Sequence, residues 1–309
     1  MSAVRTTCPY CGVGCGIAVE RAAGEGWNIA GDPSHPANFG RLCSKGAALA
    51  DTLDTDGRLL YPEIGGRRVD WDAALDTVAR RFADTIARHG PEAVAFYVSG
   101  QMLTEDYYVA NKLIKGFIGS ANIDTNSRLC MASAVAGHKR AFGADAVPVS
   151  YADVERADLA VLVGSNAAWC HPVLFHRLLR ARKREPQRRI VVVDPRRTAT
   201  CEAADLFLPI RPGTDAVLFN GLLSWLRRED ALDLEFIELS TSGIGAAMRA
   251  AKETAPSVSA VAAACGLDEE SVARFYRWFA ATPRVVTLFS QGINQSSSGT
   301  DKVDAIVNV

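Results

Sequence analysis

Four cysteines near the amino terminus have the residue type and spacing of a metal site. Cys8, Cys11 and Cys15 form a C-x2-C-x3-C run, and Cys43 stands alone further along the chain. Thiolates in groups of four select zinc or an iron–sulfur cluster. Structural zinc sites commonly use paired C-x2-C knuckles, whereas three bunched cysteines and one distant cysteine suit a cubane. We therefore predict a [4Fe–4S] cluster, with a zinc site or unlinked buried cysteines as the alternatives.

Two further residues could take part in redox chemistry. Lys45 follows Cys43 by two residues, and beside an anionic cluster it could tune the potential or bridge to a second redox group. By itself such a lysine is normally a solvated surface charge. Cys130 precedes an expected helix, where the helix dipole and Arg128 would stabilise a thiolate. Cys130 fits a metal ligand or a reactive thiol, and a buried structural cysteine is an equally good interpretation.

Polar residues follow four apolar runs that we expect to be strands. The segments that follow them are Ser99–Gln101, Gly164–Asn166, Asp194–Arg196 and Ser290–Gln295. Ligands of open α/β sheets bind beyond the carboxyl ends of the strands. Glycine lets the backbone approach a phosphate, and the N-terminus of a following helix adds positive potential. The pattern predicts a nucleotide-type binder without the G-x-G-x-x-G fingerprint, and ordinary turns are the alternative.

The first half of the chain changes character near residue 60. Residues 1–60 are rich in Cys and Gly and predict a small strand-and-loop module around the metal site. Apolar residues at helical spacing then predict a helix over Trp71–His89, which Gly90-Pro91 ends. A strand is expected over Ala93–Val98. Further helices are expected over Leu103–Ile118 and Met131–Phe142, each closed by a glycine.

A βαβ rhythm begins at about Tyr151. The apolar runs Leu159–Val163 and Ile190–Val193 flank a helix expected over Pro172–Lys183, which is the usual size of a βαβ unit. Later elements are expected over Ala216–Arg228, Ser271–Ala281, Val285–Phe289 and Asp301–Val309. Continuous apolar strands belong to parallel sheets that are covered on both faces. The last helix is not closed by Gly, Pro or a polar tail, so we expect a truncated chain or a fragment.

The predicted fold class is α/β, with a small N-terminal [4Fe–4S] strand-and-loop module and mainly parallel, dinucleotide-binding-like sheets after it. We expect domains at 1–60 (cluster), 61–150 (α/β, with the Cys130 segment) and 151–309 (α/β, incomplete at its C-terminus). The chain has 309 residues, 48% of them hydrophobic, and this is enough for several cores.

Charge and composition exclude several classes of function. A net charge of −1 provides no broad basic field for nucleic acid. No apolar run is long enough to cross a bilayer, and the start has neither an apolar signal core nor paired arginines. We therefore predict a cytoplasmic protein without nucleic-acid or membrane partners. Eight cysteines in such a chain do not indicate a disulfide framework.

Together these motifs resemble the molybdopterin oxidoreductases of the dimethyl-sulfoxide-reductase superfamily, over essentially the whole chain. Cys8–Gly16 (Cys-Pro-Tyr-Cys-Gly-Val-Gly-Cys-Gly) and Leu42–Gly46 resemble the [4Fe–4S] module of that superfamily. Arg128–Val135 resembles the molybdenum-ligand segment of nitrate reductases. Val163–Pro172 and Gln291–Ser296 are most similar to the cytoplasmic assimilatory branch, so the chain resembles the N-terminal part of its catalytic subunit.

The resemblance implies two cofactors, a [4Fe–4S] cluster and a molybdenum bis-molybdopterin guanine dinucleotide. It makes Cys130 the molybdenum ligand and Lys45 an electron relay between cluster and pterin. The positions that match pterin-dinucleotide contacts are Lys45, Gln101, Asn126, Gly164, Ser165, Asn166, Asp194, Arg196, Gly213, Thr214, Asp215, Gln291 and Gln295. Gln291 departs from relatives that have Met there. Family members are considerably longer, so we expect that the C-terminal domain that completes their second pterin site is not part of this sequence. We therefore expect this chain alone to bind the cofactor poorly and to be inactive.

The implied reaction converts nitrate, two electrons and two protons into nitrite and water. The electrons would come one at a time through the cluster from a donor protein or domain, such as a ferredoxin, a flavodoxin or an NAD(P)H-linked flavoprotein. A cysteine-type formate dehydrogenase is a competing interpretation, but such relatives usually have His after the metal ligand, where this chain has Met131. A non-catalytic iron–sulfur electron-transfer subunit, as in respiratory complex I, and a zinc-stabilised α/β protein are two further interpretations of the same sequence.

Overall fold

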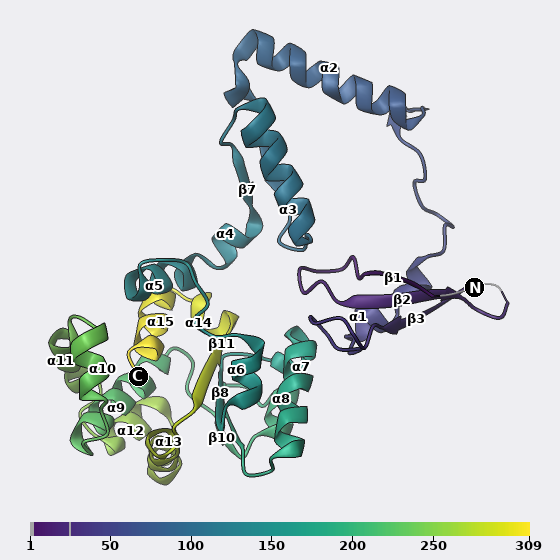
Figure 1. Cartoon of the computed structure of the whole chain (residues 1–309). Coiled ribbons are helices and arrows are strands. Elements are labelled where there is room, and N and C mark those ends of the chain that lie inside the picture. Colours follow the sequence, from purple (N-terminus) through teal and green to yellow (C-terminus); the bar gives the residue numbers. More distant parts are fainter. Residues whose placement is uncertain (1–2, 25) are drawn as a thin grey trace. The chain divides into compact units, whose positions relative to one another are not determined.

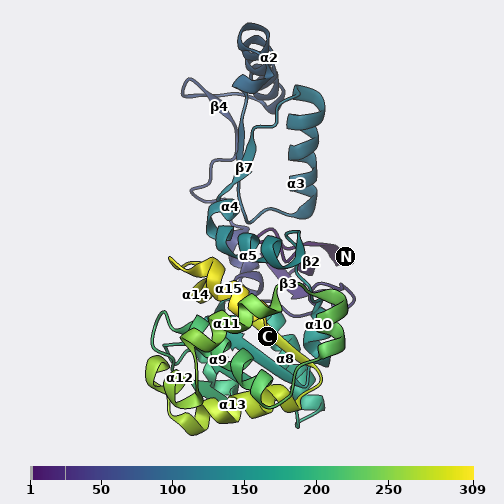
Figure 2. The same ribbon diagram turned by 90° about the vertical axis from the view of Figure 1, so that its left-hand side faces the viewer.

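The computed structural model describes residues 3–24 and 26–309. The chain forms two compact units, which divide between Cys130 and Met131. This division comes before the boundary expected near residue 150, because helix α5 (Ala132–Phe142) packs against the last helix, α15 (Gly299–Val307), as Figures 1 and 2 show. The expected division into three domains stays a prediction.

The first unit begins with a small antiparallel sheet in the order β1-β2-β3 (Figure 1). Its strands are Val4–Thr7, Gly16–Arg21 and Trp27–Gly31. Helix α1 (Ser44–Ala47) and the 3-10 turn η1 (Leu49–Thr52) pack against β3. The expected strand-and-loop module is confirmed.

The rest of the first unit contains short strands and longer helices. Helix α2 has the predicted bounds Trp71–His89: Asp70 caps it by accepting the Ala73 N–H at 2.7 Å, and Gly90 ends it with a φ of +82°. The helix expected over 103–118 is α-helical over Thr104–Asn111 (α3) and π-helical over Lys112–Ile118 (η3). The remaining elements are β4 (Glu63–Ile64), β5 (Arg67–Arg68), η2 (Pro91–Ala93), β6 (Phe96–Val98), β7 (Ile123–Thr125) and α4 (Asn126–Cys130).

The second unit is built on a parallel sheet in the order β10-β9-β8-β11. Its strands are β8 (Leu159–Val163), β9 (Arg189–Val193), β10 (Leu206–Leu208) and β11 (Val285–Phe289). Every residue of β8 is buried, as a strand covered on both faces must be. The predicted α/β class with parallel strands is confirmed.

Helices cover both faces of this sheet, since successive strand residues point to opposite sides. Val161 and Val191 face a core formed with α9 (Asp215–Arg228), α12 (Val258–Cys265), α13 (Glu269–Ala281) and α15. Leu162 and Val192 face a second core formed with α6 (Tyr151–Arg156), α7 (Ala167–Cys170), α8 (Pro172–Arg184) and η4 (Ala199–Ala203). Both cores therefore hold the carboxyl ends of the strands in fixed positions.

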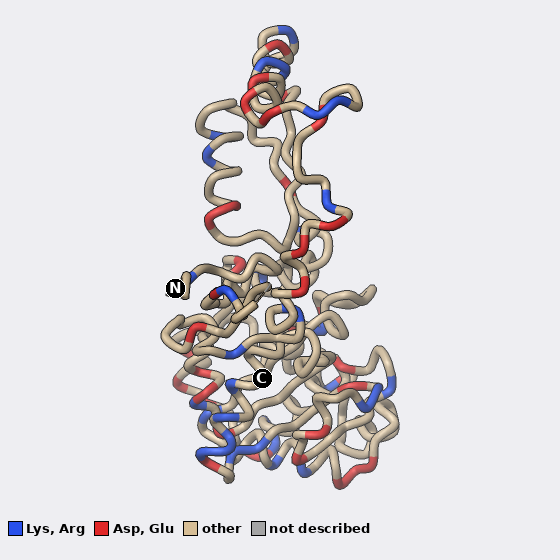
Figure 3. The backbone as a smooth tube through the Cα atoms, turned by 90° about the vertical axis from the view of Figure 1, so that its right-hand side faces the viewer, with Lys and Arg blue, Asp and Glu red and all other residues tan. Residues whose placement is uncertain are grey.

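Three further helices complete the second unit, namely α10 (Leu234–Ser240), α11 (Ile244–Thr254) and α14 (Gln291–Asn294). None of the helices in the described part of the chain combines the length and the apolar character needed to cross a membrane. Basic and acidic residues are interspersed along the backbone of both units (Figure 3), in keeping with the near-zero net charge.

Candidate functional site

The turn between β1 and β2 carries three of the four predicted cluster cysteines. Cys8 directly follows β1 and Cys15 directly precedes β2, and the Cys8 N–H donates to the Cys15 carbonyl at 2.8 Å. Within this closed turn, Gly14 has a φ of +64° and donates its N–H to the Cys11 carbonyl at 3.2 Å. The hairpin therefore gathers three thiols in one short segment.

The fourth cysteine is positioned by a buried asparagine that sequence reasoning did not single out. Asn38 has no exposed surface; its Nδ2 donates to the carbonyls of Gly16 and Arg41 at 3.0 and 2.9 Å, and its Oδ1 accepts the Gly16 N–H at 2.8 Å. Gly16 adjoins Cys15, so Asn38 fastens the segment before Cys43 to the hairpin. Cys43 then caps α1. Only the folded structure reveals these partners, because Asn38 has no distinguishing spacing in the sequence.

The four thiols influence one another electrostatically. Burial, and then the thiols of Cys8, Cys11 and Cys43, raise the pKa of Cys15 from 9.0 to about 11. Such coupling requires the groups to lie near one another. Four thiolates repel one another unless positive charge lies between them, and the iron ions of a cluster supply that charge. The donor set therefore fits a [4Fe–4S] cluster.

The alternative of a zinc site requires all four sulfurs to surround one metal ion. Within residues 3–24 and 26–309, no three His, Cys, Asp or Glu side chains are arranged around a point that could hold one metal ion. Each cysteine of a cubane bonds a different iron, whereas all sulfurs of a zinc site lie about 2.3 Å from the same ion.

Lys45 lies on α1, the short helix that Cys43 caps. Its side chain is exposed, and its Nζ lies 5.9 Å from the centroid of the Tyr10 ring. Tyr10 belongs to the hairpin turn between Cys8 and Cys11. This cation–π contact joins the predicted relay lysine to the cluster-binding turn.

The predicted molybdenum-ligand segment begins where β6 and β7 end. These two strands pair in parallel, so their carboxyl ends lie at the same edge. The Gly100 N–H donates to Asn126 Oδ1 at 2.9 Å, and Gln101 is the next residue. The structure thus joins the predicted residue Asn126 to the backbone directly before the predicted residue Gln101. Cys130, which is half-buried, ends the short helix α4 that starts at Asn126.

Arg128, which we expected beside the Cys130 thiolate, has a carboxylate partner. Its Nε lies 2.7 Å from Asp124 Oδ2. The hydrogen bond from Arg128, followed by that from the Thr125 N–H, lowers the pKa of Asp124. The i,i+4 spacing of Asp124 and Arg128 was a sequence signal for this pair. Arg128 therefore helps to fix the segment that ends at Cys130.

The sheet of the second unit has its topological switch point between β8 and β11. The chain proceeds from β8 to β9 and β10 on one side and places β11 on the other side. Gly164, with a φ of +55°, follows β8, and the Gly292 N–H donates to its carbonyl at 3.0 Å. Ser165 is buried next to Gly164. The predicted segments after β8 and β11 are thus joined at the position where open α/β sheets bind ligands.

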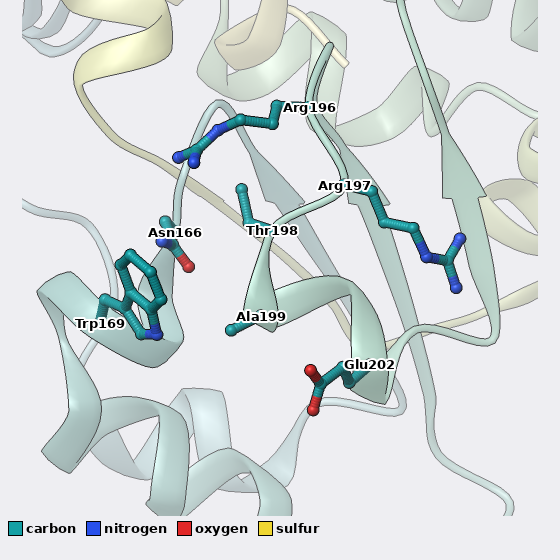
Figure 4. Close-up of a pocket in the computed structure, with 7 residues that line it drawn as sticks. All are labelled: Asn166, Trp169, Arg196, Arg197, Thr198, Ala199 and Glu202. Carbon is teal, nitrogen blue, oxygen red and sulfur yellow. The ribbon is translucent and has the colours of Figure 1, made fainter.

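A cavity of about 350 Å³ opens at the carboxyl ends of β8 and β9. It is lined by Asn166, Trp169, Arg196, Arg197, Thr198, Ala199 and Glu202 (Figure 4). Figure 4 shows the Arg196 side chain extending toward the side where Asn166 and Trp169 lie, whereas Arg197 extends the other way, with its guanidinium 5.4 Å from the Phe207 ring centroid. Asp194 Oδ1 accepts the Arg196 N–H at 2.8 Å and so shapes this loop. Two predicted residues, Asn166 and Arg196, therefore line one cavity.

Two side chains that line the cavity, Arg196 and Trp169, are of the types that bind nucleotides. A guanidinium binds phosphate oxygens through charge-assisted hydrogen bonds, and an exposed indole provides a stacking surface. Trp169 is 72% exposed. In the sequence, Trp169 lies within the Val163–Pro172 motif without a role of its own, and Thr198 and Glu202 have no distinguishing spacing.

The Gly213–Asp215 segment lies at the start of α9, but the Asp215 side chain turns inward. Its Oδ2 lies 2.7 Å from Lys302 Nζ, and the two side chains are only 9% and 4% exposed. Sequence reasoning did not single out Lys302. Gln291 is the first residue of α14 and Gln295 directly follows the helix, and both are exposed. Between them, the buried Asn294 donates its Nδ2–H to Met131 Sδ at 3.5 Å.

Comparison with known proteins agrees with this architecture. Residues 1–55 match the molybdopterin oxidoreductase Fe4S4 domain, and residues 58–309 match the molybdopterin oxidoreductase family. Among solved structures, the acetylene hydratase of Pelobacter acetylenicus is similar with a TM-score of 0.78 at 25% identity. The similarity covers 98% of this chain and 42% of that one.

Curated relatives include several nitrate reductases. The nitrate reductase of Klebsiella oxytoca is 56% identical over 100% of this chain and 35% of its own length, and that of Shewanella frigidimarina is 46% identical over 100% and 34%. More distant relatives include a periplasmic nitrate reductase of Desulfovibrio desulfuricans (39%), an assimilatory nitrate reductase of Haloferax mediterranei (35%) and an F420-dependent formate dehydrogenase subunit of Methanocaldococcus jannaschii (31%).

The chain spans about a third of the length of the first two of these relatives. Within that span both family domains are present, and the four cysteines lie in the first of them. The chain therefore belongs to the molybdopterin oxidoreductases, molybdenum enzymes whose [4Fe–4S] cluster and molybdopterin cofactor are held by these two domains.

Proposed function

We propose that this chain is the cofactor-binding N-terminal part of an assimilatory nitrate reductase, which reduces nitrate to nitrite in the cytoplasm. The observation that carries the proposal is the 56% identity with a nitrate reductase over the whole chain, compared with 31% for the formate dehydrogenase subunit. Met131 after Cys130 supports the same choice.

Electron entry is assigned to the first module. Cys8, Cys11, Cys15 and Cys43 hold the [4Fe–4S] cluster, which fits their mutual effect on the pKa of Cys15. Lys45 serves as the electron relay, and its contact with the Tyr10 ring supports a defined position for the ammonium. The electron donor is a ferredoxin, a flavodoxin or an NAD(P)H-linked flavoprotein.

The molybdenum site is assigned to the end of the first unit. Cys130 supplies the thiolate ligand, and Gln101 and Asn126 contact the pterin from the adjoining strand ends. When bound, the molybdenum bis-molybdopterin guanine dinucleotide supplies the two-electron redox centre for oxygen-atom removal from nitrate. The chain itself contributes the fixed backbone around Asn126 and the Asp124–Arg128 ion pair, which position Cys130.

The dinucleotide portions of the cofactor are assigned to the second unit. Arg196 binds phosphate oxygens in the cavity beside Asn166, and Trp169 offers its indole to a planar ring. Backbone groups of Gly164, Ser165, Gly213 and Thr214, together with Asp194, Gln291 and Gln295, complete the contacts. The Gly164–Gly292 junction supports this assignment because it lies at the switch point of the sheet.

The proposal is tested with the complete enzyme to which this chain belongs, purified without oxygen. Nitrate should be consumed at the expense of a reduced viologen dye, nitrite should appear in equal amount, and formate should not reduce the oxidised dye. Formate oxidation without nitrate reduction would assign the chain to the formate dehydrogenases. Iron without molybdenum and without either activity would identify a non-catalytic electron-transfer subunit.

A further inference from the structure

The buried ion pair between Lys302 and Asp215 lies inside an apolar core. The neighbours of Lys302 on α15 include Val303 and Ile306, and α9 contributes Leu218 to the same core. Removing two charged groups from water costs free energy that their attraction offsets only in a good geometry. A core that needed cohesion alone would be served by apolar residues at both positions. The ion pair is therefore better explained by a role in positioning the two segments that carry it.

Asp215, at one end of the ion pair, belongs to a turn that several hydrogen bonds stabilise. Gly213 has a φ of +90°, and Thr214 Oγ1 donates to the Arg211 carbonyl at 2.7 Å. From the other side, Arg211 Nη1 donates to the Ala264 carbonyl at 2.9 Å, and Cys265 Sγ donates to the Thr214 carbonyl at 3.7 Å. These hydrogen bonds attach the turn to α12. The Asp215 carboxylate lies at the positive end of the α9 dipole and connects the turn to α15 through Lys302.

Lys302 fixes the other end, one helical turn after the loop that follows β11. Its N–H donates to the Ser298 carbonyl at 3.1 Å, and the Gly299 N–H donates to the Ser296 carbonyl at 3.0 Å. Gly299 also lies against Ser133 of α5 so closely that a Cβ would come within 2.9 Å of it. The segment that carries Gln291 and Gln295 therefore leads directly into the tightly packed first turn of α15.

The two turns joined by this pair belong to opposite edges of the sheet. The Gly213–Asp215 turn follows β10, and the Gln291–Gln295 segment follows β11. These are the outer strands in the order β10-β9-β8-β11. A shift of either helix would change the distance between the two segments.

We propose that Lys302 is a positioning residue that acts through Asp215 to hold the Gly213–Asp215 turn and the Gln291–Gln295 segment in a fixed position relative to each other. In this proposal the Asp215 carboxylate binds Lys302 and does not contact the cofactor. Asp215 contributes to cofactor binding through this ion pair, which we call the brace, and through the backbone of its turn. The inference rests on the proposed function, because both segments are assigned there to the pterin dinucleotide.

Hydrogen exchange measured by mass spectrometry on the oxygen-free full chain tests the brace without reference to activity. Lys302→Met should speed amide exchange about tenfold in both the 213–218 and the 295–299 segments, because each loses its tie to the other. Lys302→Arg, which keeps the charge, should restore protection in both. Lys252→Met, at an exposed lysine of α11, is the control and should change neither segment.

A double variant separates positioning from stability. In the complete enzyme, Asp215→Leu combined with Lys302→Leu should bring the thermal midpoint back from that of Lys302→Met to that of the unchanged enzyme, since apolar side chains replace the pair. The pterin dinucleotide content should nevertheless stay about tenfold below that of the unchanged enzyme. Full pterin content in the double variant, or faster exchange confined to α15 in Lys302→Met, would overturn the proposal. If the unchanged complete enzyme held no pterin, the proposed function would fail, and the exchange comparison would still decide whether the ion pair links the two segments.

Discussion

Gly164 and Gly292 lie back to back at the switch point of the parallel sheet. The Gly292 N–H donates to the Gly164 carbonyl at 3.0 Å, and a Cβ on Gly164 would come within 2.8 Å of the Gly292 Cα. Two backbones can approach this closely only where neither residue has a side chain. This junction fixes the loops after β8 and β11, which carry several of the proposed cofactor contacts.

Gly164→Ala should therefore destabilise the second unit by two effects. An alanine at a φ of +55° is strained, and its methyl group overlaps Gly292. The matched control is Gly143→Ala, where φ is +75° but the added Cβ meets open space. The control should cost about 1 kcal/mol, and Gly164→Ala should cost about 1–3 kcal/mol more because of the overlap. Urea unfolding measures both, and equal costs would contradict the close junction.

The neighbouring arginines Arg196 and Arg197 should differ in their effect on cofactor retention. Arg196 extends into the cavity beside Asn166, whereas Arg197 lies against the Phe207 ring (Figure 4). Loss of a charge-assisted hydrogen bond costs about 1.5–3 kcal/mol. The complete enzyme with Arg196→Gln should therefore retain at least about tenfold less pterin dinucleotide than the unchanged enzyme. Arg197→Gln should retain nearly the full amount. Pterin fluorescence after acid release gives the comparison, and an equal loss in both variants would argue against the assigned cavity.

Tyr10 should influence the potential of the cluster through Lys45. Lys45→Met removes a positive charge from the segment that follows Cys43, so the cluster should become harder to reduce and its midpoint potential should fall. Tyr10→Leu removes the ring 5.9 Å from the ammonium and should shift the potential in the same direction by less. Tyr10→Phe keeps the ring and should leave the potential unchanged. Redox titration followed by electron paramagnetic resonance measures the series, and a Tyr10→Phe shift as large as that of Tyr10→Leu would exclude the cation–π explanation.

The raised pKa of Cys15 predicts a pH dependence in the metal-free protein. Since the folded pKa, about 11, lies above the ordinary value of 9.0, the thiol is protonated in the folded state at neutral pH. The stability that this protonation contributes is present below pH 9 and is lost as the pH rises through about 11. Iodoacetamide should accordingly alkylate Cys15 slowly at pH 8 and faster at higher pH. The exposed Cys170 is the internal control, and equal rates at the two positions would contradict a buried Cys15 thiol with a raised pKa.

Much of the fold follows from local sequence patterns. Helix α2 has the bounds given by its apolar spacing and its Gly90-Pro91 end. The strands β8, β9 and β11 coincide with continuous apolar runs, because strands covered on both faces admit few polar residues. Strand β10, with three residues, is too short to give such a pattern. The π-helical turn η3 continues the hydrophobic spacing of a helix, so the sequence did not distinguish it.

The proposed site is only partly visible in the sequence, for a physical reason. The four cluster cysteines and the glycine-rich strand ends have local spacing that indicates their chemistry, whereas the role of Cys130 comes from the family resemblance. Asn38 and Lys302 owe their roles to partners far away along the chain, namely Gly16 and Asp215. The same is true of Asn294 and its contact with Met131. Such residues are recognised only when the fold has brought the partners together.

The central claim is that four thiols in the first module hold one iron–sulfur cluster, and metal analysis of the oxygen-free chain tests it most directly. We predict iron and acid-labile sulfide in equal amounts, a spectrum that bleaches on reduction, and loss of both in Cys15→Ala but not in Cys201→Ala, whose buried cysteine lies in the second unit. Stoichiometric zinc without sulfide, or iron that survives in Cys15→Ala, would contradict the account.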